Sequence, residues 1–172
     1  NKPSQNKKIN QIEISENESR VKIIKNIENA YKKAPYFKEV FPIIKKVILG
    51  KYTHIDEMAI SSLIAVCKYL NLEINYDRSS KADPNSQGQE KCERLASITK
   101  TLGFSNYVNV INDMYDKETF KTKGVNLFFN DHKIKPYKQF GKPFVSHLSI
   151  IDVLMFNSIR DVKKLILSYH II

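Results

Sequence analysis

The stretch "YVNVINDMYDKETFKTKGVNLFF" (residues 107–129) decides the fold. Its apolar, β-branched ends predict strands at 107–111 and 125–129, and the polar segment 115–124 between them predicts a short helix that ends at Gly124. Two strands joined through a helix favour parallel pairing, because a parallel pair needs a long crossover connection. This stretch therefore predicts an α/β protein with a parallel pair in its sheet.

The sequence before this stretch extends the same alternation. A strand is predicted at "LEINYD" (72–77), followed by a polar loop at 78–89 and a helix at about 90–102 that ends at Gly103. Two further helices are predicted after residue 149. We therefore expect a flexible leader at 1–8 and then one α/β domain at 9–172, with a small parallel-containing sheet flanked by several helices.

The first third of the chain predicts three helices after a short strand at 8–14. Each helix shows apolar residues at helical spacing, and capping boxes (Ser15 with Glu18, Thr53 with Asp56) precede the first and third helices. The predicted buried positions are Val21, Ile24, Ile27 and Tyr31; Phe37, Phe41, Ile44 and Ile48; and Ile60, Leu63, Ile64, Cys67 and Leu70.

Composition limits the class of protein. The 172 residues are 42% hydrophobic and 27% charged, as in a folded globular chain. The apolar runs are shorter than the roughly 20 residues that span a bilayer, and the basic, polar beginning is unlike a signal peptide, so we expect a cytoplasmic protein without membrane insertion. Cys67 and Cys92 lie on apolar helix stripes and are expected to be buried free thiols.

The net charge of +10 is concentrated in the two ends of the chain, whereas the middle is acidic. Basic ends suit nucleic acid or phosphorylated metabolites. A genome rich in A and T would produce the same excess, because the chain is rich in Lys, Asn and Ile together. The charge alone does not choose between these explanations.

"HLSIIDVLMFN" (147–157) contains a carboxylate among apolar residues. Ser149 and Asp152 form an S-x-x-D capping box, in which the carboxylate would accept a backbone N–H at the helix start. Alternatively, the apolar neighbours bury Asp152, and a buried carboxylate is costly unless it has partners, which is typical of a functional site. Ser158 and Asp161 repeat the S-x-x-D pattern.

The loop that follows the predicted strand at 72–77 is the candidate anion site. Ser79 and Ser80 lie in this loop, and Lys91 and Arg94 lie in the first turns of the next helix. Ligands of parallel sheets collect at carboxyl strand ends, where helix N-termini and cations hold phosphate or carboxylate groups. A solvated loop with charges on a helix face is the alternative.

A second candidate set contains tyrosines and an amide. Tyr107, Tyr115, Tyr137 and Gln139 follow the later strands, and aromatic rings with an amide suit sugars or bases, although packing explains the rings equally well. The four histidines are scattered, so no metal site is predicted, and no glycine-rich phosphate loop or nucleophile elbow is present. The sequence does not identify a cofactor.

Several segments in order resemble the WbqC-like protein family, over roughly residues 9–160. They are "YKKAPYFKEVFPIIKKVI" (31–48), "SSK" (79–81), "EKCERLASITKTLGFSNYV" (90–108), "MYDKETFKTKGVNLFF" (114–129) and "PYKQFGKPFVSHLSIIDVLMFN" (136–157). The most specific piece is Y-x-Q, a Phe and then L-S-I-I-D-x-L-x-F-N. The family's N-terminal stretch, with its Gln-Pro and Pro-Trp pairs, is missing, and Ser158-Ile159 replace a residue followed by Gly after Asn157.

The resemblance implies a role in the biosynthesis of bacterial O-antigen or another surface polysaccharide. We expect a transferase-like protein that acts on an activated sugar, a nucleotide-sugar or another phosphorylated metabolite. Asp152 is then the candidate general base. The candidate ligand-binding residues are Ser79, Ser80, Lys91, Arg94, Tyr107, Tyr115, Tyr137, Gln139 and Asn157. A nucleic-acid-binding module and a non-catalytic partner protein are the alternatives.

Overall fold

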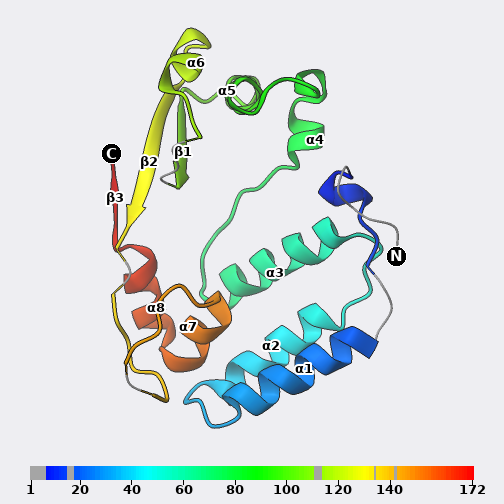
Figure 1. Ribbon diagram of the computed structural model, residues 1–172, viewed down its shortest axis with the longest axis vertical. Coiled ribbons are helices and arrows are strands. Elements are labelled where there is room, and N and C mark those ends of the chain that lie inside the picture. The colour runs from blue at the N-terminus through cyan, green and yellow to red at the C-terminus, as the bar shows by residue number, and fades with distance from the viewer. Residues whose placement is uncertain (1–6, 15–17, 111–113, 134, 142) are drawn as a thin grey trace. The chain divides into compact units, whose positions relative to one another are not determined.

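The protein is described from a computed structural model that covers residues 7–14, 18–110, 114–133, 135–141 and 143–172. These residues form eight α-helices and a three-stranded mixed sheet with one parallel pair, which confirms the α/β class (Figure 1). The chain divides into two compact units, one made of residues 1–74 with 135–165 and the other of 75–134 with 166–172. The assignment of residues 9–172 to one domain stays a prediction.

The second unit contains the sheet. Strand β1 (Asn106–Val110) pairs in parallel with β2 (Asn126–His132), and helix α6 (Lys117–Thr122) lies between them in the chain. This confirms the interpretation of residues 107–129. Strand β3 (Tyr169–Ile171) pairs antiparallel with β2. The sequence did not predict β3, because three exposed residues carry no alternating pattern.

The core of the second unit lies between helix α5 (Lys91–Thr101), α6 and β2. Its buried apolar residues are Ala96, Phe120, Val125 and Leu127. Ahead of α5, the predicted polar loop holds helix α4 (Ser79–Ala82) and the 3₁₀ turn η2 (Pro84–Ser86). The strand predicted at 72–77 is wrong: residues 72–78 form neither helix nor strand, and Leu72 and Ile74 are exposed. A strand needs a neighbour as well as alternation.

The first unit is helical. It contains α1 (Glu18–Tyr31), α2 (Phe37–Ile48), α3 (Ile55–Tyr69), α7 (Ile150–Phe156) and α8 (Ile159–Ile166), and α2 packs against α1, α3 and α7 (Figure 1). These helices confirm the predicted ones. Their shared core consists of Ile24, Ala34, Val40, Ile44, Ile48, Leu70, Leu154, Met155 and Val162.

Two expectations for the first unit are wrong. The predicted strand at 8–14 is the 3₁₀ turn η1 (Ile9–Gln11), followed by a single bridge between Glu13 and His54. The predicted stripe of α3 is only partly buried: Leu70, just after the helix, is 1% exposed, but Leu63 is 59% exposed, and no residue within α3 is fully buried. An amphipathic stripe predicts a helix more reliably than it predicts what covers that helix.

The helix starts differ from the predicted capping boxes. Ser15 lies outside the described residues. At the start of α3, Glu57 accepts the backbone N–H groups of Thr53 (2.8 Å) and His54 (3.3 Å), so Glu57 performs the role that was predicted for Asp56. Cys67 and Cys92 are free thiols, as predicted, but they are half-buried.

Candidate functional site

Helix α7 begins with a serine cap that does not use Asp152. The Oγ of Ser149 accepts the backbone N–H of Ile151 at 3.2 Å, and the backbone N–H of Asp152 donates to the Ser149 carbonyl at 2.9 Å. The carboxylate of Asp152 takes no part in this cap. It is 4% exposed and turns toward other segments of the first unit.

Three donors from distant positions hold the Asp152 carboxylate. Oδ1 accepts the Tyr137 hydroxyl at 2.6 Å and Nε2 of Gln139 at 2.8 Å, and Oδ2 accepts the Tyr31 hydroxyl at 3.0 Å. These four residues are called the Asp152 cluster below. The capping interpretation of Asp152 is therefore wrong, and the structure brings together three of the predicted site residues with Tyr31.

Sequence reasoning assigned Tyr31 only to the buried stripe of α1. Tyr31 is the last residue of that helix and lies 121 positions before Asp152, so no local pattern connects the two. Tyr31 could have been linked to Asp152 only by chemical reasoning. A carboxylate predicted to lie among apolar residues needs donors, and a tyrosine on a buried helix face can supply one.

Gln139 joins the carboxylate to the segment 135–149, whose described residues form neither helix nor strand. Its Nε2 also donates to the Val145 carbonyl (3.1 Å), and its Oε1 accepts the Val145 backbone N–H (2.9 Å). One side chain therefore closes the loop from 139 to 145 and hydrogen-bonds Asp152. This arrangement uses both ends of the amide and fixes which end faces the carboxylate.

The two phenols remain protonated at neutral pH. Burial, followed by the hydrogen bond and the charge of Asp152, raises the pKa of Tyr31 to about 12. The same causes raise the pKa of Tyr137 well above its usual range. Both phenols and the Gln139 amide are neutral donors, and no cation pairs with the carboxylate in the described part of the chain.

Aromatic rings surround the cluster. Phe156 contacts Tyr31 (ring centroids 6.1 Å apart) and Phe140 (4.7 Å) edge to face, and Tyr137 contacts Phe144 in the same way at 5.1 Å. Phe140 is nevertheless 57% exposed. A buried, hydrogen-bonded carboxylate thus lies among aromatic residues, one of which, Phe140, is open to solvent.

The predicted anion site is only partly assembled. Nη2 of Arg94 donates to Oγ of Ser79 at 3.4 Å, whereas Nζ of Lys91 lies 4.0 Å from the centroid of the Tyr115 ring. Ser80 is half-buried in α4. Because residues 72–78 form no strand, this group cannot lie at a carboxyl strand end, and the original reason for an anion site there no longer holds.

Two of the remaining predicted residues have structural contacts. The ring of Tyr107 stacks on Phe120 at 5.4 Å, and burial raises the pKa of Tyr107. Asn157 ends α7, and its backbone N–H and Nδ2 both donate to the Val153 carbonyl (3.1 and 2.8 Å). These contacts correspond to the packing alternative, and a ligand role for either residue stays a prediction.

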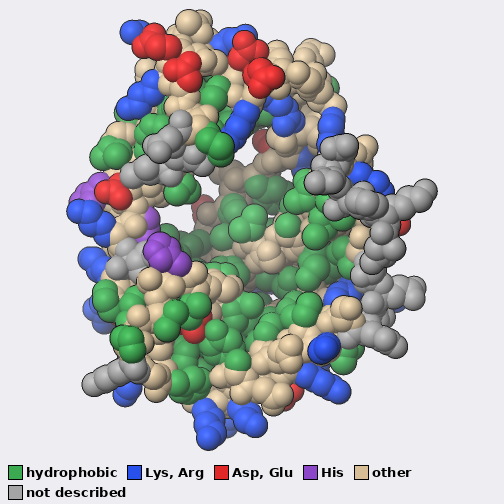
Figure 2. Space-filling view, in the orientation of Figure 1, with side chains coloured by type: hydrophobic (Ala, Val, Ile, Leu, Met, Phe, Trp, Pro, Cys, Tyr) green, Lys and Arg blue, Asp and Glu red, His purple; other side chains and the backbone are tan. Residues whose placement is uncertain are grey.

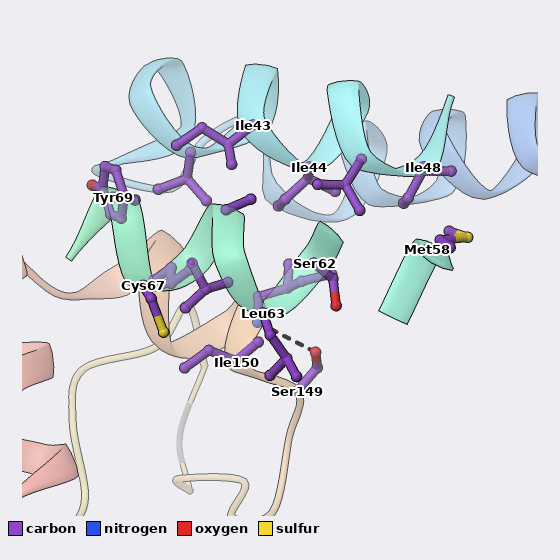
Figure 3. A pocket seen from close by; sticks show the side chains of 16 residues that line it. Ile43, Ile44, Ile48, Met58, Ser62, Leu63, Cys67, Tyr69, Ser149 and Ile150 are labelled. Carbon is purple, nitrogen blue, oxygen red and sulfur yellow. Dashed lines mark hydrogen bonds between the residues drawn. The ribbon is translucent and has the colours of Figure 1, made fainter. Parts of the chain in front are cut away.

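The first unit also contains an apolar cavity of about 370 Å³ between α2, α3 and the start of α7 (Figure 3). Figure 3 shows Ile43 and Ile44 of α2 facing Leu63 of α3 and Ile150 of α7. The hydroxyls of Ser62 and Ser149 that border it already bond to backbone groups. Asp152 does not line this cavity.

The described residues give no sign of a metal site, a membrane-spanning helix or a single basic patch. Among them no group of His, Cys, Asp or Glu could hold a metal ion, and no helix has the length and apolarity to cross a bilayer. In the view of Figure 2, the Lys and Arg side chains are spread over several elements and do not form one patch.

The chain was compared with known families, curated proteins and solved structures. The family model described as "WbqC-like protein family" matches residues 1–164, nearly the whole chain. No curated protein and no solved structure matches it. The match includes all four residues of the Asp152 cluster. The chain therefore belongs to the WbqC-like protein family.

Proposed function

We propose that this WbqC-like protein is a transferase of bacterial surface polysaccharide (O-antigen) biosynthesis that acts on an activated sugar, with Asp152 as its general base. The observation that carries the proposal is the Asp152 carboxylate, which is 4% exposed and hydrogen-bonded only to neutral groups. A buried carboxylate whose neighbours have shifted pKa values is a feature of sites that transfer protons.

The hydrogen-bond count leaves one position for a substrate. Oδ1 already accepts two donors, whereas Oδ2 accepts only Tyr31 among the residues that the structure describes. A carboxylate oxygen has two lone pairs, so Oδ2 can accept one more hydrogen bond. An acceptor hydroxyl placed there would pass its proton to Oδ2 as its oxygen attacks the anomeric carbon of the activated sugar. The bond from that carbon to the phosphate oxygen breaks, and the phosphate or nucleotide leaves with the bonding electron pair.

The neighbours of Asp152 suit this role. Tyr31 and Tyr137 stay protonated, so they orient the carboxylate without competing for the substrate proton. The exposed Phe140 ring offers a flat apolar face, and the C–H face of a sugar stacks on such rings. Sugars are activated in the cytoplasm, where we place the protein.

A structural role for the same cluster is the main competitor. The carboxylate also ties the segment 135–149 to α1 and α7, which a non-catalytic partner protein would need as much as an enzyme. A nucleic-acid-binding module is the second competitor. It rests on the net charge of +10 alone.

The test is genetic complementation in the bacterium that encodes the chain. Deletion should remove one substituent or sugar from the surface polysaccharide, as measured by NMR and mass spectrometry of the purified polymer. The wild type and Asp161→Asn should restore it. Asp152→Asn, which keeps the shape of the side chain, should not restore it although the protein accumulates and remains folded.

Two results would overturn the proposal. An unchanged polysaccharide in the deletion strain removes the assigned pathway. Full restoration by Asp152→Asn removes the general base and leaves the structural role. Binding of nucleic acid that weakens steeply with added salt would support the basic binding module instead.

A further inference from the structure

In the second unit, three short elements meet at a junction. Two charged side chains there have hydrogen-bonding groups without a partner among the described residues. Helix α4, turn η2 and helix α5 contact one another, so residues 78–90 are folded onto α5. Asp83 connects α4 to η2, and Arg94 lies in the first turn of α5. We call this group, with Ser79, the α4–α5 junction.

Asp83 is buried without a partner for its carboxylate. It is 7% exposed, and only its backbone carbonyl is used, which accepts the N–H (3.3 Å) and Oγ (2.9 Å) of the fully buried Ser86. Within the described residues, its side chain has neither a hydrogen bond nor an ion pair. A carboxylate oxygen has two lone pairs, so this side chain has unused capacity for a donor.

Arg94 is a cation that has hydrogen-bond donors without an acceptor among the described residues. Its Nη2 donates to Ser79 at 3.4 Å, and its Nε is buried without any hydrogen-bond partner. In the described part of the chain, no carboxylate lies within ion-pair distance of Arg94, including that of Asp83. A guanidinium that bonds one hydroxyl through Nη2 has further terminal N–H groups that can donate to an anionic oxygen.

We infer that the α4–α5 junction binds a sugar phosphate. The phosphate accepts hydrogen bonds from Arg94 and Ser79, and a sugar hydroxyl donates to Asp83. This assignment does not depend on a strand end, and the nature of the ligand rests on the proposed function. It adds Asp83 to the binding residues, although no sequence motif includes this position.

Calorimetric titration of the full chain with the 1-phosphates of glucose, galactose and N-acetylglucosamine tests the site. At least one should bind, and Arg94→Gln should abolish its binding. Asp83→Asn should weaken it by about tenfold, because an amide is a poorer acceptor than a carboxylate. Inorganic phosphate should bind Asp83→Asn as well as or better than the wild type, since a negative charge has been removed and no sugar hydroxyl is involved.

Matched controls use neighbouring exposed charges. Asp77→Asn and Lys81→Gln change the net charge of the same segment, and both should leave sugar phosphate binding unchanged. Calorimetry tests binding at the junction without turnover. A failure to bind sugar phosphate can therefore be told apart from a failure of the polysaccharide experiment.

Three outcomes overturn the inference. None of the three sugar phosphates binds. Asp83→Asn strengthens sugar phosphate and phosphate equally, which shows only repulsion by Asp83. Glycine binds in their place, with its ammonium group on Asp83 and its carboxylate on Arg94, which would assign the junction to amino acids.

Discussion

Helices α7 and α8 begin with nearly the same four residues, Ser-Ile-Ile-Asp (149–152) and Ser-Ile-Arg-Asp (158–161), yet the two aspartates have opposite surroundings. At α8 the serine and the aspartate bond each other: Oδ2 of Asp161 accepts the Ser158 hydroxyl at 2.6 Å, and the Asp161 backbone N–H donates to Ser158 Oγ at 3.2 Å. The carboxylate remains exposed and lies 3.4 Å from Nζ of Lys164.

At α7 the serine forms its cap, but the aspartate turns to donors in other segments. The third residue of each motif differs in polarity, Ile151 against Arg160, and Ile151 packs against the core whereas Arg160 is exposed. An S-x-x-D motif thus predicts a helix start reliably. The role of its aspartate depends on whether that turn of the helix is buried.

The largest expected difference between the two aspartates is the loss of stability when each is replaced by alanine. Asp152→Ala leaves three donors, on Tyr31, Tyr137 and Gln139, without their shared acceptor, so it should lower the free energy of unfolding by about 3–5 kcal/mol. Asp152→Asn keeps one acceptor oxygen and should cost about 1–2 kcal/mol. Urea unfolding followed by circular dichroism measures both.

An equal and small effect of Asp152→Ala and Asp161→Ala would contradict the comparison. It would mean that water satisfies the three donors once the carboxylate is removed. The segment 135–149 would then be ordered by its own contacts, such as those of Gln139 with Val145, and not by Asp152.

The second prediction concerns alkaline pH. The pKa of Tyr31 is about 12 in the folded protein against 10.0 for a free tyrosine, so the folded state holds this proton longer than the unfolded state does. The stability that Tyr31 contributes is complete below pH 10 and is lost as the pH rises toward 12. Tyr137 acts in the same direction.

Titration of phenolate absorbance, combined with unfolding curves across this range, measures the effect. Tyr31→Phe should remove one late-titrating phenol and flatten the fall in stability, and Asp152→Asn should move the remaining transitions to lower pH. Asp161→Asn should leave them in place. A Tyr31 that titrates at its usual value would show that its hydrogen bond to Asp152 does not persist in solution.

The sequence predicted the parts of the fold that depend on local information. The β1–α6–β2 unit was found because strands, helix and Gly124 are contiguous, and α1 and α2 were found from their apolar spacing. The strand at 72–77 was wrong, because alternation does not show whether a partner strand exists.

The candidate site was predictable in its residues but not in its geometry. Tyr137, Gln139 and Asp152 were all named, since they lie within one motif-rich stretch. Tyr31 and Asp83 were not named as site residues. Tyr31 reaches Asp152 only through tertiary packing, and Asp83 is distinguished only by burial without a donor, which a sequence cannot show.

The smallest expected effects concern the serines and the exposed aspartate. Ser149→Ala and Ser158→Ala each remove a hydroxyl that accepts a backbone N–H, and each should cost about 1 kcal/mol of stability. Asp161→Ala should lower the melting temperature less than Ser158→Ala does, because solvent surrounds its carboxylate and the serine can still accept the backbone N–H. In the α7 motif the order should be reversed, with Asp152→Ala far more damaging than Ser149→Ala. Thermal unfolding of these four variants measures the ranking, and the same order in both helices would show that the two aspartates play the same role.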